Sequence, residues 1–107
     1  MNDGYNNLGV KRVQDTLGEA HAALTRAIGE VSHAPDALFC SHFEALVDLL
    51  EAAFRVEESL MESCNYCAVR GHREEHARVL ATLHQLEPRI EQGQLEIGHQ
   101  ALELLPQ

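Results

Sequence analysis

Apolar residues recur at alternating steps of three and four positions along the middle of the chain. The clearest series begins just after Pro35 and Asp36 and contains, in order, Phe39, Phe43, Leu46, Leu50, Ala53, Glu57 and Leu60. This is the heptad spacing by which a helix presents one face to the interior of a bundle. The pattern therefore predicts a long helix from residue 36 to the polar stretch 63–66, where a loop is expected.

A second series with the same spacing follows that loop. Its members are Val69, His72, His76, Val79, Leu83, Leu86 and Ile90. Pro88 lacks a backbone donor and clashes with the preceding turn, so it is expected to kink or interrupt this helix. Gly93 then indicates a turn, and residues 95–105 indicate a short last helix.

The first helix is expected to begin at Thr16, because Thr16 and Glu19 form a capping-box pattern. Its inward stripe combines one histidine with four apolar residues, namely Leu17, His21, Leu24, Ile28 and Val31. The polar residues 1–15 are interpreted as an N-terminal arm. Four helices with short connections predict a single all-α domain over residues 1–107, an antiparallel four-helix bundle with a short fourth helix.

Composition agrees with a helical protein and excludes several functions. The 107 residues are rich in Leu and Ala and contain no Trp, and the net charge is -9 with histidine neutral. That charge argues against binding to nucleic acid or to an anionic membrane. No apolar run approaches the ~20 residues of a membrane helix, and the N-terminus lacks the features of a signal peptide. With three cysteines a disulfide framework is not expected, and a cytoplasmic location is expected.

The inward stripes also carry residues that bind metals: His21, Glu57, His72 and His76. Histidines at positions i and i+4 on one helix face can hold a single ion, and a carboxylate from a facing helix can complete or bridge a site. One histidine on an apolar face is usually a hydrogen-bonded core residue. Four such residues converging from three helices favour a metal site in the bundle.

These residues resemble the core signature of hemerythrin-like proteins, particularly the bacterial ones. The matching positions are Phe54, Glu57, Glu58, Met61, Tyr66, His72 and His76, preceded by His21 and Leu24 in the first helix. The resemblance implies a four-helix bundle around a non-heme di-iron site that binds dioxygen. By the same resemblance Glu57 is the bridging carboxylate, His72 and His76 ligate one iron, and His21 ligates the other.

Two departures from the family pattern change the expected chemistry. Ala53 stands where the family has a ligand histidine, and the family's final Trp-Leu, His and Asp elements are absent; His99 and Glu103 are weak substitutes. The chain is therefore interpreted as a degenerate or C-terminally incomplete member with an incomplete di-iron site. We expect one or two iron ions, zinc as an alternative, or no metal. The implied role is sensing or carriage of dioxygen, nitric oxide or redox state, and not enzymatic turnover.

Other interpretations stay open. The domain could be a metal-free structural or interaction module. It could also hold zinc through His21, Cys40, His72 and His76, an order that loosely resembles chemoreceptor zinc-binding domains, and Cys64 and Cys67 form a further C-x-x-C pair. Six further ionisable side chains are expected to be solvated: His33, His84, Glu58, Glu62, Glu74 and Glu75. A short fourth helix exposes apolar residues, so a homodimer is expected.

Overall fold

The chain forms four helices, which confirms the predicted all-α class. The structure is a computed structural model that describes residues 2–63 and 69–105. The helices are α1 (Asn2–Ser32), α2 (Asp36–Ser63), α3 (Val69–Glu91) and α4 (Leu95–Leu104), and the described residues contain no strand. The loop expected at 63–66 falls mostly outside these residues, except that Ser63 ends α2.

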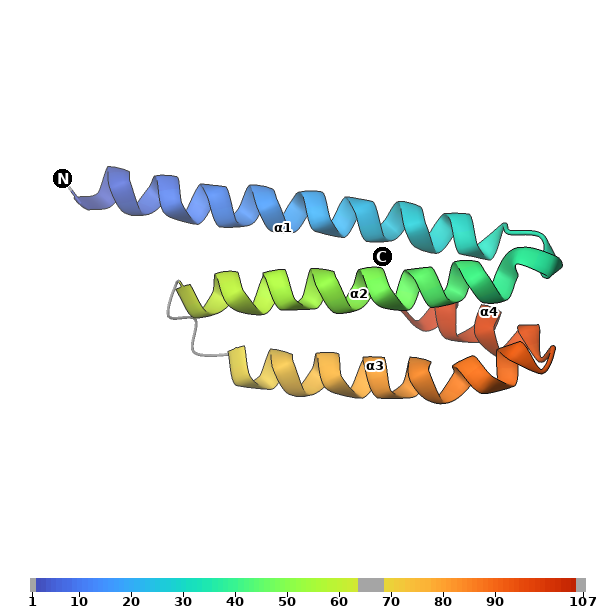
Figure 1. Cartoon of the computed structure of the whole chain (residues 1–107). Helices are drawn as coiled ribbons and strands as arrows, with labels where there is room; N and C mark the ends of the chain where they lie inside the picture. The colour runs from blue at the N-terminus through green and yellow to red at the C-terminus, as the bar shows by residue number, and fades with distance from the viewer. Residues whose placement is uncertain (1, 64–68, 106–107) are drawn as a thin grey trace.

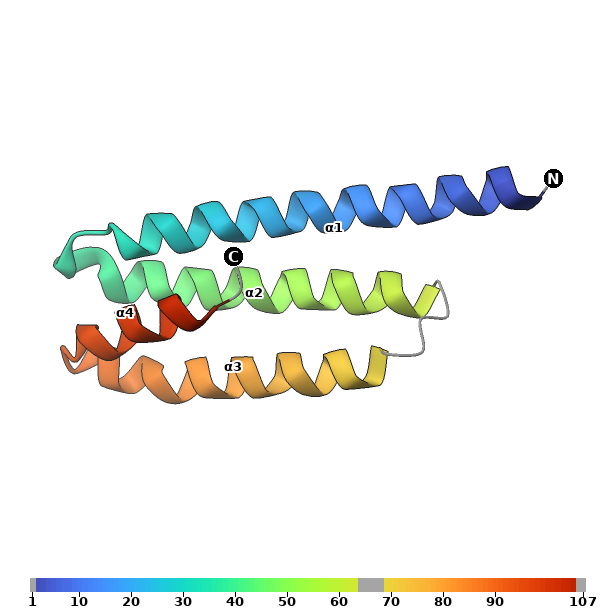
Figure 2. The same ribbon diagram turned by 180° about the vertical axis from the view of Figure 1, so that it is seen from behind.

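The three long helices run side by side along the molecule, and α4 lies behind α2 and α3 at one end in Figure 1. The reverse view in Figure 2 places α4 in front, between the same two helices. In the described part of the chain α4 packs against each of the other helices, whereas α1 and α3 make no close backbone contact. The bundle therefore has four walls near the α1–α2 turn and three walls at its opposite end.

The hydrophobic core fills the four-walled half. Its buried members come from all the helices, and they are Ile28, Val31, Phe39, Phe43, Leu46, Val47, Leu50, Leu83, Ile90, Leu102 and Leu105. Most of the α2 series predicted from the heptad pattern is buried, but the burial stops after Leu50 except for Met61. Beyond Leu50, Phe54 and Glu57 are only half-buried because α4 has already ended.

The end of α3 is fixed by a Schellman motif at Gly93. The Gln94 N–H donates to the Arg89 carbonyl at 3.1 Å, and the Gly93 N–H donates to the Ile90 carbonyl at 2.9 Å. Gly93 has φ of 95°, a conformation that glycine adopts without the Cβ penalty. The predicted turn at Gly93 is therefore confirmed, and it directs α4 back along α2 and α3.

The structure corrects the expected start of α1 and narrows the expectation for Pro88. Pro88 does not interrupt α3, which continues to Glu91, so the kink remains the prediction for this residue. The proline lies in the last turn, and buried Leu83 and Ile90 anchor the helix on both sides of it. Helix α1 begins at Asn2 and not at Thr16. Residues 2–15 of the expected arm are therefore helical, and Thr16 lies inside the helix. Extending a helix that is already formed avoids the cost of nucleating a new one.

Gly98 allows α4 to approach the core closely. A Cβ at this position would lie 2.6 Å from Phe39 Cε1 and 3.0 Å from Ile90 Cδ1. Gly98 and Phe39 are both fully buried, so neither can shift into solvent. The close packing of α4 against Phe39 and Ile90 therefore depends on the lack of a side chain at Gly98.

We predict that Gly98→Ala lowers the melting temperature measured by circular dichroism. Overpacking costs about 1–3 kcal/mol, which offsets or exceeds the ~1 kcal/mol that alanine gains over glycine in a helix. The matched control is Gly18→Ala in α1, where a Cβ meets nothing within 4 Å. This control is expected to raise the melting temperature, and an equal rise for Gly98→Ala would contradict the tight contact.

His84 links α2 and α3 on the outside of the bundle. Its Nε2 lies 2.6 Å from Glu51 Oε1 and its Nδ1 lies 3.3 Å from Glu87 Oε1. His84 is exposed, as expected, with 49% of its side chain accessible, but it is also paired with carboxylates. The hydrogen bond to Glu51 raises the pKa of His84 above its ordinary value, with further contributions from the charges of Glu87 and Asp48.

This contact predicts a pH dependence of folding stability. The folded state binds the His84 proton more tightly than the unfolded state, so the stabilisation is complete below about pH 6.5 and is lost as pH rises through the higher folded pKa. Because the pair is exposed, we expect at most about 1 kcal/mol in urea unfolding, and less in high salt. His84→Gln should remove this slope, whereas the exposed-histidine control His42→Gln should keep it. A slope unchanged in His84→Gln would assign the effect to other groups.

Candidate metal centre

A pocket of about 260 Å³ opens at the point where α4 ends. Helices α1, α2 and α3 and the residue after α4 supply its walls. The lining residues are His21, Leu24, Ile28, Leu50, Phe54, Glu57, His72, Glu75, His76, Val79 and Leu105. The four residues that the sequence analysis selected as metal ligands all line this pocket, with a mostly apolar wall on the side of the core.

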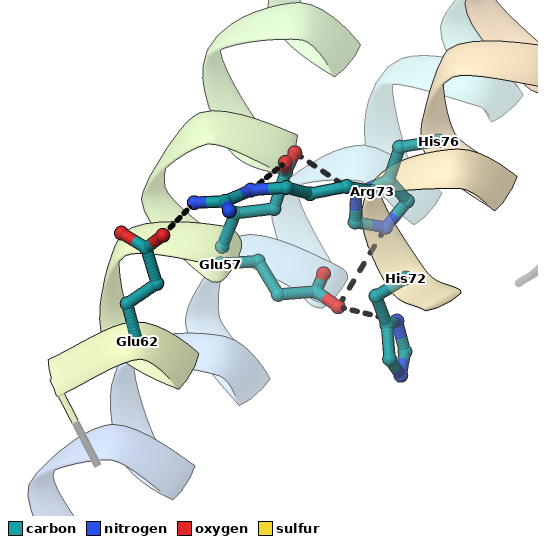
Figure 3. A network of polar contacts seen from close by, with 6 residues as sticks. Glu57, Glu62, His72, Arg73 and His76 are labelled. Atoms are coloured by element: carbon teal, nitrogen blue, oxygen red, sulfur yellow. Dashed lines mark hydrogen bonds and ion pairs between the residues drawn. The ribbon is translucent and has the colours of Figure 1, made fainter. Parts of the chain in front are cut away.

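Glu57 from α2 lies between two histidines from α3, as Figure 3 shows. Its Oε1 is 3.5 Å from His72 Nδ1 and 3.7 Å from His76 Nε2. Ligand atoms from these three residues all lie within 4.8 Å of one another. The i, i+4 spacing on α3 places both rings on the face toward α2, as predicted.

The two Glu57 distances are longer than ordinary hydrogen bonds, which join such atoms at about 2.7–3.2 Å. They are close to the separation of neighbouring ligands around one ion. With metal–nitrogen and metal–oxygen distances of about 2.1 Å, adjacent ligand atoms lie roughly 3.0–3.4 Å apart. Glu57 and each histidine therefore fit neighbouring ligands of one transition-metal ion after movements of a few tenths of an ångström, and all three ligand atoms lie within 4.8 Å of one another.

His76 is the most enclosed of the three residues. Its side chain is 11% exposed, and the Phe54 ring stacks on it with a centroid distance of 3.8 Å and an angle of 4°. Its second nitrogen, Nδ1, lies 3.2 Å from Glu58 Oε2. His76 thus contacts one carboxylate through each ring nitrogen, and one of its faces is covered.

Glu58 is not the solvated residue that we expected. Its side chain is 20% exposed, and its Oε1 accepts a 3.1 Å hydrogen bond from Arg73 Nε. The same guanidinium donates to Glu62, which raises the pKa of Arg73 above its ordinary value. Glu62 is exposed, as expected, but it is paired with Arg73. Glu58 and Glu62 of α2 are joined in one network to Arg73 and His76 of α3, beside Glu57 and His72; Figure 3 shows the dashed contacts of this network.

His21 faces the same pocket from α1 but does not join the close group. Its side chain is exposed, and its ring nitrogens are not among the atoms within 4.8 Å. His99 packs on Phe39 with ring centroids 4.3 Å apart, which places it in the four-walled half; Glu103 is exposed. Phe39 and Glu57 are 18 residues apart on α2, or about 27 Å along the helix, so His99 does not substitute for a missing ligand.

Cys40 lies in a separate cluster with Glu44 and Glu91 near the other end of α2. It is 17 residues, or about 25 Å of helix, from Glu57. The structure therefore does not bring Cys40 together with the histidines, which contradicts the four-ligand zinc site. Burial and the charges of Glu44 and Glu91 raise the pKa of the Cys40 thiol, and a protonated thiol is a poor ligand. Cys64, Cys67 and Tyr66 lie outside the described residues.

The contacts of three residues beside the ligands were not predicted from the sequence: the Phe54 stack, the Glu58 contact and the Arg73 pairing. Phe54 and Glu58 are among the matching positions of the family signature, which implied no such contact, and Arg73 is not among them. Glu58 and Glu62 are four residues apart on α2, and Arg73 follows His72 directly. This pattern of two acids and one arginine beside the ligand positions was the available signal. It could not be assigned without knowing the rotation of α2 against α3.

The fold and the pocket define a helical-bundle protein with a cluster of histidine and carboxylate ligands. A bacteriohemerythrin from Ralstonia nicotianae (strain ATCC BAA-1114 / GMI1000) is 30% identical over 96 residues, which cover 85% of this chain and 70% of that protein. The chain belongs to the hemerythrin-like family. No family model and no solved structure matches it. Among the described residues, no helix is both long and apolar enough to cross a membrane.

Proposed function

We propose that this domain binds non-heme iron through Glu57, His72 and His76 and serves as a sensor or carrier of dioxygen, nitric oxide or redox state. The observation that carries the proposal is the position of Glu57 Oε1, 3.5 Å and 3.7 Å from one nitrogen of each histidine. Two histidines and one carboxylate that leave further positions open are a known donor set for non-heme Fe(II). The family relationship to a bacteriohemerythrin supports the same metal.

The walls of the pocket fit a small apolar ligand. Leu24, Ile28, Leu50 and Val79 line it together with the candidate ligands. When bound, iron supplies open coordination positions that take dioxygen or nitric oxide. The apolar side chains limit water at those positions, and His21 and Glu75 provide polar groups at the exposed side.

The geometry favours one ion over a complete di-iron centre. Glu57, His72 and His76 converge, while His21 lies apart on α1 and Ala53 offers no ligand atom one turn before Glu57. A second ion would need ligands besides His21. Zinc is an alternative occupant, because nitrogen and oxygen donors also suit it.

A metal-free structural module is the second candidate. It is favoured by the contacts of His76: the ring stacks on Phe54, and its Nδ1 already has a hydrogen-bond partner in Glu58 without any metal. In that module Glu57 is simply a half-buried partner of two histidines. The two candidates differ in what happens when Glu57 is replaced.

Glu57→Gln is expected to weaken iron binding at least tenfold with little change in the apoprotein melting temperature. The substitution keeps the shape of the side chain and removes the anionic ligand. Anaerobic Fe(II) titration against a chelator measures the affinity. The control is Glu74→Gln, an exposed residue of α3 outside the pocket, which should bind as the unaltered protein does. Equal affinities for the two variants would show that Glu57 is not a ligand of the ion.

Glu57→Leu separates the two candidate functions by stability. In an iron-binding domain, the stabilisation by added Fe(II) should be greatly reduced in this variant. A ligand that binds only the folded state stabilises it by an amount that grows with the logarithm of its concentration over Kd. In a metal-free module, Fe(II) stabilises neither protein. Leucine then raises the melting temperature, since a carboxylate no longer has to be desolvated.

A further inference from the structure

We propose that Glu58, held by Arg73, is a positioning residue that selects the tautomer and ring orientation of His76. In this arrangement the Nε2 lone pair of His76 is presented to the metal side of the pocket. The role of this contact in metal binding rests on the proposed function, whereas the contact itself is made in the metal-free protein.

The hydrogen bond to Glu58 determines which nitrogen of the neutral His76 ring carries the proton. A carboxylate only accepts hydrogen bonds, so the 3.2 Å contact from Nδ1 to Glu58 Oε2 requires the proton on Nδ1. Nε2 is then unprotonated, and it is the nitrogen that lies 3.7 Å from Glu57 Oε1. An unprotonated nitrogen is the form that binds a metal.

Phe54 and Glu58 restrict the ring in complementary ways. The parallel stack on Phe54, 3.8 Å away, defines the plane of the imidazole. A half-turn of the ring about its bond to Cβ would preserve that stack but would direct carbon atoms toward Glu57 and Glu58. Of the contacts to Glu58 and Glu57, which both distinguish the two orientations, the hydrogen bond to Glu58 is the shorter, so this carboxylate has the larger influence on which edge of the ring faces the pocket.

Arg73 keeps Glu58 in the position that this contact needs. It occupies Glu58 Oε1 through a 3.1 Å hydrogen bond, which leaves Oε2 for His76. Arg73 also donates to Glu62, so the guanidinium is held at two points on α2. Glu58 and His76 are 20% and 11% exposed, whereas Arg73 and Glu62 are 46% and 52% exposed. The inner pair is therefore the rigid part of the network.

The test compares Glu58→Gln and Glu58→Ala with the unaltered chain, first without metal. The ¹⁵N chemical shifts of the His76 ring at about pH 8, where an ordinary histidine is neutral, report the tautomer directly. The unaltered chain is expected to hold the proton on Nδ1. Both variants should move it substantially to Nε2. Alanine offers no acceptor, and when the glutamine oxygen faces Arg73 its NH2 group faces Nδ1 and can only donate to it, which requires the proton on Nε2. A purely structural role for Glu58 would leave the tautomer unchanged.

Affinity for Co(II), measured by competition with a chelator, is the second readout. Loss of a carboxylate that supports a ligating histidine typically weakens metal binding 10–100-fold, and we expect this for both variants. Glu62→Gln is the matched control, because it removes the charge of the other acid that pairs with Arg73 without touching His76. It should keep the Nδ1 tautomer and bind within about threefold of the unaltered chain.

The outcomes separate this inference from the proposed function. If the tautomer moves in the Glu58 variants while the unaltered chain binds neither Co(II) nor Fe(II), Glu58 positions His76 and the metal proposal fails. If the unaltered chain binds metal and the Glu58 variants keep both tautomer and affinity, the positioning role is overturned. Circular dichroism melting of each variant establishes that the comparison is made on folded protein.

Discussion

The short reach of α4 is the constraint on which the rest of the structure depends. Its ten residues cover only part of the length of α2 and α3. Where the fourth wall exists, apolar faces of all four helices meet and exclude water, which is the dominant favourable term in folding. Where it ends, the inward faces of three helices are left partly open. Core and pocket are therefore two halves of one bundle, and Leu105 belongs to both.

His76 lies at the boundary between these halves and is the one buried polar residue of the described chain. A polar ring is costly to bury unless its hydrogen-bonding atoms have partners. Glu58 on α2 supplies such a partner for Nδ1, and Phe54 covers one face of the ring. Nε2 faces the pocket, 3.7 Å from Glu57 Oε1. The same contacts that make burial tolerable also place an unprotonated nitrogen beside a carboxylate. Stability and the candidate chemistry therefore depend on one set of interactions.

Carboxylates elsewhere in this acidic chain serve to join helices. Glu51 of α2 pairs with His84 of α3 in the four-walled half, and Glu87 supports the same histidine from within α3. Glu58 and Glu62 hold Arg73 between the same helices in the open half. Both contacts are partly exposed, so each contributes modestly and is weakened by salt. They align α2 with α3 at two points along their length, which fixes the relative position of Glu57 and the two histidines.

The sequence by itself determined the helices and the candidate ligands. Alternating steps of three and four predicted α2, α3 and the buried residues from Phe39 to Leu50, because helical periodicity is a local property of the chain. The same periodicity placed Glu57, His72 and His76 on inward faces. Tertiary structure decided what local patterns cannot contain. Only the packing of α2 against α3 showed that Glu58 and Arg73 support His76, that Cys40 lies about 25 Å of helix from Glu57, and that His21 faces the pocket without joining the ligand group. Local signals also misjudged Thr16 and left open whether Pro88 interrupts α3, because helix continuation depends on neighbouring turns and on packing, which a single capping motif or proline does not override.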